Sequence, residues 1–171
     1  MMRIIFILIL FLISACSRVS LENYQGTLPA LDLKAFFDGE LIAYGILQNR
    51  SGQVIRKFSA TIDASWVGDQ GTLVEHFIYD DEEQDRIWEL TYQGDNLYTG
   101  IAGDVEGVAR GEIAGSAFNW KYQLEVPWGD GSILLNLDDW LYLVEENHLI
   151  NRTDLTKFGF RVAELTLVIE K

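Results

Sequence analysis

The sequence is poor in residues that cross-link a chain, bind metals or restrict the backbone: its 171 residues include one cysteine, two histidines and two prolines. A single cysteine excludes a disulfide within the chain. A zinc site needs three or four ligands at suitable spacing, and this composition offers few. We therefore expect no metal site, and no motif in the sequence points to a cofactor.

Basic residues are also scarce, because 13 Lys and Arg stand against 26 Asp and Glu and leave a formal net charge of −13. Proteins bind nucleic acids by placing Lys and Arg against the phosphates, so this balance argues against a nucleic-acid partner. It argues in the same way against adhesion to anionic lipids through the charge of the protein itself.

The N-terminus has the pattern of an export signal. A short basic start with Arg3 precedes the apolar run Ile4–Ile13, which is too short to span a hydrocarbon core of about 30 Å as a helix. The next residues complete Ile13-Ser14-Ala15-Cys16, which resembles the bacterial lipobox. We therefore predict a lipoprotein signal peptide over residues 1–15 and a lipid anchor on Cys16, where two or three acyl chains give stable attachment to a membrane.

The residue after the cysteine bears on which membrane holds the anchor. In enterobacterial-type sorting, an aspartate at this position favours retention in the inner membrane, and here the residue is Ser17. We therefore expect a cell-envelope protein anchored to the outer membrane and facing the periplasm. Residues 16–33 are expected to form a lipidated tether, and residues 34–171 a β-barrel domain.

The body of the chain alternates apolar and polar residues, which is the period of β-strands. Turn signals rich in Gly, Asn and Asp separate the alternating runs. Nine runs are delimited in this way: 41–48, 53–66, 72–79, 84–93, 97–103, 117–127, 132–143, 148–157 and 160–170.

Short connections between strands predict an antiparallel, up-and-down meander of about eight to ten strands. Closing the sheet hides its apolar face and removes exposed edges, so a barrel is the first choice and a sandwich the second. One short helical turn is expected at Ala35-Phe36-Phe37, after Asp32.

Four aromatic residues fall on the predicted inward faces of these strands: Trp66, Trp88, Trp120 and Tyr122. Small barrels are either filled by side chains or hold one ligand. The four residues therefore either fill the core or line a ligand cavity, and the sequence leaves both alternatives open.

Asp138 and Asp139 are neighbours in a predicted strand, so their side chains point to opposite faces. Asp139 shares its face with apolar residues. If that face is interior, Asp139 is a buried acid that needs a partner, and Arg152 on the next strand is the candidate for a buried polar or ligand-binding pair. Alternatively, the strand bends near Asp138 and both acids reach water.

Several stretches of the mature chain are specific for a family when they are taken together, although no single one is. They include Phe37-Asp38-Gly39, GILQNRSGQVIRKF over residues 45–58, Gly71-Thr72-Leu73, Asp138-Asp139-Trp140-Leu141-Tyr142, Leu149-Ile150-Asn151-Arg152 and Lys157-Phe158-Gly159-Phe160. As a set they resemble a family of uncharacterised proteobacterial lipoproteins, catalogued as domain of unknown function 3833. The sequence departs from the expected pattern at Ser116 and Ala163. The resemblance implies a lipoprotein with a lipocalin-like β fold, and it implies no activity.

Motifs for catalysis are missing, since the sequence has no Gly-x-Ser-x-Gly elbow for a serine nucleophile. Our leading hypothesis is a membrane-anchored, non-enzymatic module that binds a hydrophobic or lipid-like ligand inside its barrel. The first alternative is a structural or assembly accessory protein of the cell envelope, docking a protein partner that the sequence does not identify. The second is an enzyme acting on envelope lipid or glycan.

Overall fold

The computed structural model describes residues 19–80 and 82–171. Within them, two short helical segments, η2 (Leu21–Tyr24) and α2 (Leu33–Phe36), precede ten strands. The strands are β1 (Gly39–Asn49), β2 (Val54–Val67), β3 (Gln70–Tyr79), β4 (Glu83–Gly94), β5 (Leu97–Ile101), β6 (Val105–Ala114), β7 (Ala117–Trp128), β8 (Gly131–Glu145), β9 (His148–Lys157) and β10 (Phe160–Glu170). No helix among the described residues is long and apolar enough to cross a membrane.

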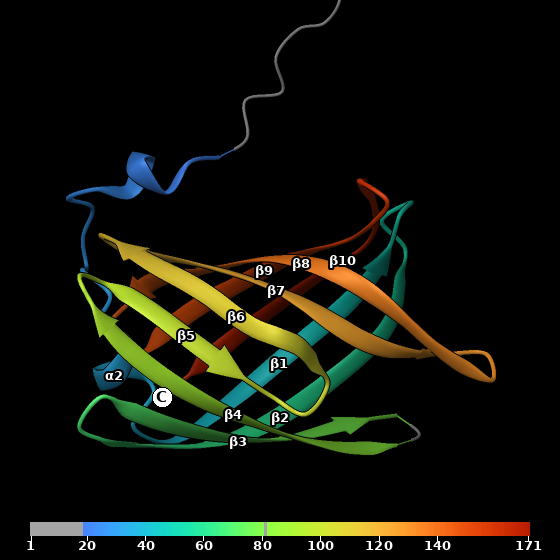
Figure 1. The fold of residues 1–171 in the computed structure, drawn as a ribbon, viewed down its shortest axis with the longest axis horizontal. Coiled ribbons are helices and arrows are strands. Elements are labelled where there is room, and N and C mark those ends of the chain that lie inside the picture. The colour runs from blue at the N-terminus through green and yellow to red at the C-terminus, as the bar shows by residue number, and fades with distance from the viewer. Residues whose placement is uncertain (1–18, 81) are drawn as a thin grey trace, which may run out of the picture.

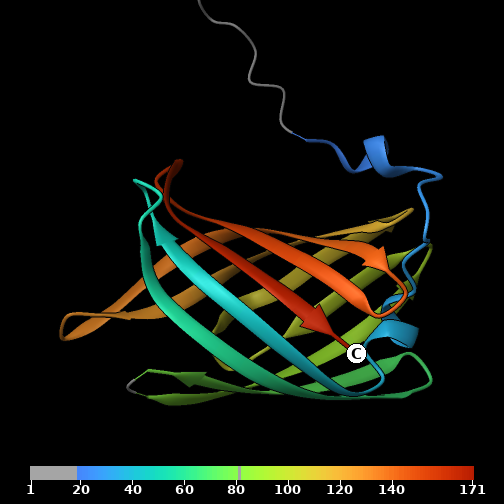
Figure 2. The same ribbon diagram turned by 180° about the vertical axis from the view of Figure 1, so that it is seen from behind.

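The strands form one closed barrel in which each strand pairs with its neighbours in sequence (Figures 1 and 2). The last strand closes onto the first, with β10 antiparallel to β1 from Ile42↔Glu170 to Asn49↔Ala163. Closure leaves no strand edge free for pairing with another chain. The predicted all-β, up-and-down, lipocalin-like barrel is confirmed.

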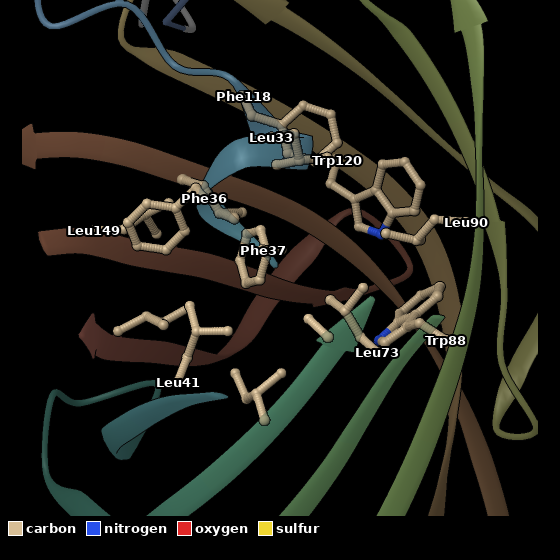
Figure 3. Close-up of a cluster of buried hydrophobic side chains, with 14 of the residues drawn as sticks. Leu33, Phe36, Phe37, Leu41, Leu73, Trp88, Leu90, Phe118, Trp120 and Leu149 are labelled. Atoms are coloured by element: carbon tan, nitrogen blue, oxygen red, sulfur yellow. The ribbon is translucent and has the colours of Figure 1, made fainter. Parts of the chain in front are cut away.

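The barrel has two different ends. The α2 end holds α2 and the turns β2–β3, β4–β5, β6–β7 and β8–β9, and the far end holds the five remaining hairpin turns (Figure 1). At the α2 end, Asp32 caps the predicted helical turn by accepting a hydrogen bond from the Ala35 N–H at 3.1 Å. Phe36 and Phe37 follow with their rings 5.2 Å apart, and both side chains are buried (Figure 3). The helical turn therefore plugs this end of the barrel.

One strand, β6, has no counterpart among the nine delimited runs. Its sequence contains Gly107 and Gly111, which weaken the alternating pattern. Gly111 pairs with Trp120 on β7, and a Cβ atom at this position would lie 2.2 Å from the Trp120 ring and 2.4 Å from the Phe118 ring. The glycine makes room for two aromatic rings on the neighbouring strand, which is a tertiary requirement that no local pattern displays.

The predicted tether over residues 16–33 is too long. The Tyr24 ring lies 5.8 Å from the Trp140 ring, outside the barrel wall. The Leu31 N–H donates a hydrogen bond to the Gly115 carbonyl at 2.8 Å, and the Leu31 side chain is buried in the main core. These contacts include η2 and the residues after it in the folded unit, so the domain begins well before residue 34. The signal peptide and Cys16 lie outside the described residues.

Candidate functional site

A cavity of about 130 Å³ lies inside the barrel. Its apolar wall comes from α2 and from strands on both sides of the barrel. The members include Leu33, Phe37, Leu73, Trp88, Leu90, Phe118 and Trp120 (Figure 3). Two small residues, Ala43 and Ala60, face each other across β1 and β2 and leave space beside this wall.

The volume of the cavity decides between the two alternatives left open for the aromatic residues. Pockets for drug-sized ligands typically measure about 300–1,000 Å³, whereas an apolar cavity of about 150 Å³ holds a benzene molecule. The aromatic side chains therefore fill most of the interior, and the space that remains suits a narrow apolar group rather than a bulky ligand.

Three of the four predicted cavity residues line this space: Trp88, Trp120 and Tyr122. Their rings pack edge to face, with Trp88 at 5.8 Å from Trp120 and 5.3 Å from Tyr122. Trp66 does not belong to the lining. Its indole N–H donates a hydrogen bond to the Phe37 carbonyl at 2.8 Å, so it helps to hold the plug at the α2 end instead.

Charged residues form a cluster halfway along the barrel. Arg86 on β4 makes a bidentate contact with Asp104 in the β5–β6 turn, with Nε to Oδ1 at 3.1 Å and Nη2 to Oδ2 at 2.7 Å. Its Nη1 lies 3.7 Å from Glu75 Oε2, beyond hydrogen-bond distance. Arg86 and Glu75 line the cavity, and their side chains are 17% and 15% exposed.

Glu75 is incompletely satisfied. Among the described residues, its buried Oε2 atom has no hydrogen-bond partner. A buried polar atom without a partner is costly, and such atoms are rare in native proteins. The carboxyl therefore has an unused site for a hydrogen bond beside an apolar cavity.

Asp139 lies on the inner face of β8, so the strand does not turn the acid out to water. Its carboxylate accepts hydrogen bonds from the Thr153 hydroxyl at 2.8 Å, from the Asn151 amide, and from the Tyr122 hydroxyl at 3.4 Å. Asn151 and Asp139 both line the cavity. Three neutral donors therefore take the place of the predicted cationic partner.

The expected pairing of Asp139 with Arg152 is wrong. Asp139 lies opposite Thr153 on β9, while Arg152 lies opposite Trp140. Residues opposite each other on antiparallel strands point to the same side of the sheet. Arg152 is therefore on the outer wall, where its guanidinium contacts Glu164 at 2.9 Å and its side chain is 57% exposed.

Burial shifts the acid–base properties of both interior carboxyl groups. It raises the pKa of Glu75 from 4.5 to about 7, although Arg86 opposes this change and Asp104 adds to it. It also raises the pKa of Asp139 from 3.8 to about 6, against the hydrogen bonds from Asn151 and Thr153. Both groups therefore change charge near neutral pH, where ordinary carboxyl groups are fully ionised.

The charges of the cluster determine which polar groups it accepts. Burial disfavours the charge of Arg86, but Glu75 and Asp104 raise the pKa of Arg86 above its ordinary value, so it stays a cation. With Glu75, Asp104 and Asp139 ionised beside the Arg86 cation, the cluster has a net charge of −2, and with Glu75 and Asp139 protonated it is neutral. The cluster therefore disfavours an anionic group and accepts a neutral donor or a cation.

Sequence reasoning missed Glu75 and Arg86, although a signal was present. Glu75 alternates with Leu73 and Phe77, and Arg86 alternates with Trp88 and is therefore on an apolar face. The pairing Glu75↔Arg86 places them side by side across β3 and β4. The parity of each strand thus predicts two interior charges of opposite sign.

Within residues 19–80 and 82–171, His, Cys, Asp and Glu side chains form no group of three or more that could hold a metal ion. The lining of the cavity includes no Ser, Cys, His or Lys among these residues. The site therefore offers hydrogen bonds and apolar contact, together with two carboxyl groups of raised pKa.

The barrel is similar to a solved structure, that of the S-type phycobiliprotein lyase CPES from Guillardia theta. The TM-score is 0.56, and the likeness covers 89% of this chain and 91% of the lyase chain. The two sequences are 8% identical, so the likeness shows the fold alone. No curated protein matches the sequence at a significant level.

The sequence itself matches a family model described as "Protein of unknown function (DUF3833)" over residues 10–171. The match covers nearly the whole chain. It includes all ten strands, the interior charged cluster and the residues Ile13-Ser14-Ala15-Cys16. The chain belongs to this family.

Proposed function

We propose that this protein is a non-enzymatic binding module for a small amphipathic molecule, held at a membrane by lipid on Cys16. The observation that carries the proposal is the Glu75 Oε2 atom, which has no hydrogen-bond partner among the described residues, beside an apolar cavity lined in part by α2. An apolar segment of the ligand would occupy the space between the plug and the aromatic rings. A neutral or cationic donor on the ligand would bind Glu75 and remove the cost of its unsatisfied oxygen.

The likeness to a phycobiliprotein lyase supports a barrel that can accommodate a small molecule, without identifying which one. The cavity volume of about 130 Å³ limits the inserted part to a narrow group such as an alkyl segment. The negative balance of the interior cluster favours an alcohol or amine over a carboxylate.

The ligand test compares three probes that share one tail: dodecanol, dodecylamine and dodecanoate. We expect the first two to raise the melting temperature at about pH 8, because binding to the folded state alone stabilises it. Dodecanoate should bind at least about tenfold more weakly than dodecanol, since its charge meets Glu75 and Asp139. Mass spectrometry of the natively extracted protein would identify the natural ligand.

Two variants of β2 provide a matched control. Ala60→Leu adds a larger side chain to the cavity, and Ser59→Leu makes the same addition on the other face of the strand. Ala60→Leu should abolish the shift caused by dodecanol, and Ser59→Leu should keep it. Equal binding by both variants, or no binding of any probe to the native protein, would contradict the proposal.

One observation favours a second candidate, an enzyme acting on an envelope lipid or glycan. Glu75 and Asp139 have pKa values of about 7 and about 6, which suit a general acid at neutral pH. The candidates differ in what happens to the ligand. A binding module returns extracted envelope lipids and glycans unchanged, whereas an enzyme produces a new species that disappears in Glu75→Gln.

The anchor has a test of its own. Replacing Cys16 with serine removes the acceptor for lipid, so the protein should leave the membrane fraction and should be detected as an unlipidated precursor. Unchanged fractionation together with an unchanged mass would rule out the lipid anchor. Separating the outer from the inner membranes of cells that make the native protein, and locating the protein in one of them, then tests the expected effect of Ser17.

A further inference from the structure

The far end of the barrel carries a local reversal of the overall charge. Two stretches there, residues 47–62 and 155–163, contain five of the 13 basic residues of the chain and no acidic residue. They include the tips of the β1–β2 and β9–β10 hairpins and the strand segments that follow or precede them. Because Asn49 pairs with Ala163, the two tips lie side by side (Figures 1 and 2).

The same tips expose large apolar side chains. Phe158 is 87% exposed and Phe160 67%, and on the other hairpin Ile55 is 51% and Val54 40% exposed. We call these four side chains, with Arg50, Arg56, Lys57, Lys157 and Arg161, the basic apolar tip. Exposed aromatic residues beside Lys and Arg are typical of proteins that sit in the interface of a bilayer.

Part of the positive charge is already used. Arg56 contacts Glu82, and Arg161 lies 2.5 Å from Glu164 and 3.4 Å from Asp154, below the tip. The Lys157 ammonium donates to the Leu134 carbonyl and stays 5.1 Å from the Phe158 ring, so its charge remains at the tip. Arg50 and Lys57 add two exposed cations that form no ion pair among the described residues, so with Lys157 the tip keeps three cations without an acidic partner there.

The β9–β10 turn places a bulky residue in a backbone conformation that such residues rarely adopt. Lys157 pairs with Phe160, so Phe158 and Gly159 form a two-residue turn, and both have positive φ, at 51° and 81°. Such turns favour Asn-Gly or Asp-Gly, and a bulky residue with positive φ is strained. The β4–β5 turn at the α2 end places Asp95 and Asn96 in the same conformation, at 50° and 64°. An aromatic residue in this position is strained and exposed, so it does not serve the stability of the fold.

We propose that the basic apolar tip docks onto the surface of an anionic phospholipid bilayer. Phe158 and Phe160 would enter the interface, and the cations around them would contact the lipid phosphates. Both views place η2 and the tip on the same side of the barrel, at its opposite ends (Figures 1 and 2). A bilayer that holds the N-terminal segment would therefore also reach the tip, and the barrel would lie along its surface.

The test measures binding to vesicles without lipid on the protein. Residues 19–80 and 82–171 contain every described strand and both hydrophobic cores, so a chain that starts at Ser17 keeps the fold and lacks both Cys16 and the apolar run. We expect this chain to sediment with vesicles of phosphatidylethanolamine and phosphatidylglycerol, but not with phosphatidylcholine alone. Binding should weaken at high salt, because salt screens surface charge.

Variants of the cations and of the exposed aromatic residue, each with a control, separate the contribution of charge to vesicle binding from that of apolar contact. Arg50→Gln with Lys57→Gln should weaken binding by at least about tenfold, since each charge near an anionic surface contributes about fivefold. Arg110→Gln with Lys121→Gln removes two exposed charges from the barrel wall and should leave binding nearly unchanged. Phe158→Asn should weaken binding by about tenfold or more while keeping a turn that favours its fold.

Trp128, which is 73% exposed on the β7–β8 hairpin, is the matched aromatic control. Binding that Trp128→Ser abolishes and Phe158→Asn leaves intact would overturn the proposal. So would equal binding to neutral and anionic vesicles, or no binding at all. These outcomes are independent of the cavity, because no ligand is present in the vesicle assay.

Discussion

The two ends of the barrel use apolar residues in opposite ways. At the α2 end, Leu33, Phe36 and Phe37 are buried in the plug, and the turns between strands are small or polar. At the far end, Phe158, Phe160 and Trp128 are left in water. Burial of apolar area stabilises a fold, so the plug contributes to stability, whereas these three exposed side chains contribute little. This difference separates residues that hold the barrel together from residues that are free to contact something else.

The largest expected effect tests the plug. Phe37→Ala should lower the free energy of unfolding by about 3–5 kcal/mol, because it removes a buried ring and opens a cavity. Phe160→Ala at the far end should change it by less than about 0.5 kcal/mol. Urea unfolding of both variants measures the difference, and equal effects would remove the contrast between the two ends.

The second prediction concerns the charged cluster between the ends. The pKa of Glu75 is about 7 in the folded protein and 4.5 ordinarily, so the folded state holds a proton that the unfolded state releases between these values. The contribution of Glu75 to stability is therefore present below about pH 4.5 and lost as the pH rises through about 7. Glu75→Gln should raise the free energy of unfolding at about pH 8 by at most about 3 kcal/mol, with little gain at about pH 4.5.

Glu89→Gln is the control for this experiment, because Glu89 lies on the outer face of the neighbouring strand β4. Unfolding curves across the pH range should be unaltered in this variant. A Glu75→Gln variant with the same pH dependence as the native protein would show that Glu75 does not titrate near neutral pH.

A smaller effect is expected from the close packing of β6. Gly111→Ala would bring a Cβ atom against the Phe118 and Trp120 rings, so it should lower the free energy of unfolding by about 1–3 kcal/mol. Gly131→Ala at the far end meets no atom within 4 Å and should be close to neutral. Thermal unfolding compares the two, and a neutral Gly111→Ala would mean that the rings move aside.

The smallest effect is expected at the β9–β10 turn. Phe158→Asn should keep or slightly raise the melting temperature, with a gain of at most about 1 kcal/mol, since Asn tolerates positive φ. The same variant should lose vesicle binding, which would show that Phe158 serves binding, whereas the apolar residues of the plug serve stability. A marked loss of stability would show instead that Phe158 supports the fold.

The fold could be predicted because strand alternation and turn residues are local signals. The runs 53–66 and 117–127 match β2 and β7 closely, and the expected turn after Asp32 is α2. Strand β6 was not predicted, because its Gly111 is required by the packing of aromatic rings from another strand. The boundary at residue 33 failed for a related reason, since η2 is held by contacts with the barrel wall.

The site was only partly predictable. Parity offered an interior Asp139 as one of two alternatives, and the structure places it inside; the partner of Asp139 depends on register between strands. A shift of one residue exchanges Thr153 for Arg152 and exchanges the interior for the surface. The cation that lines the cavity is Arg86 on β4, which is distant in sequence from Asp139 on β8.

The sequence by itself determined the class of fold, the inward faces of its strands and the family, because each depends on residue types at fixed spacing along the chain. It also determined the net charge, which argued against contact with anionic lipid. Only the tertiary structure decided which interior groups meet, how much space remains between them and where the few basic residues gather. Those properties depend on pairing and closure, which bring residues from distant strands to the same depth or the same end of the barrel.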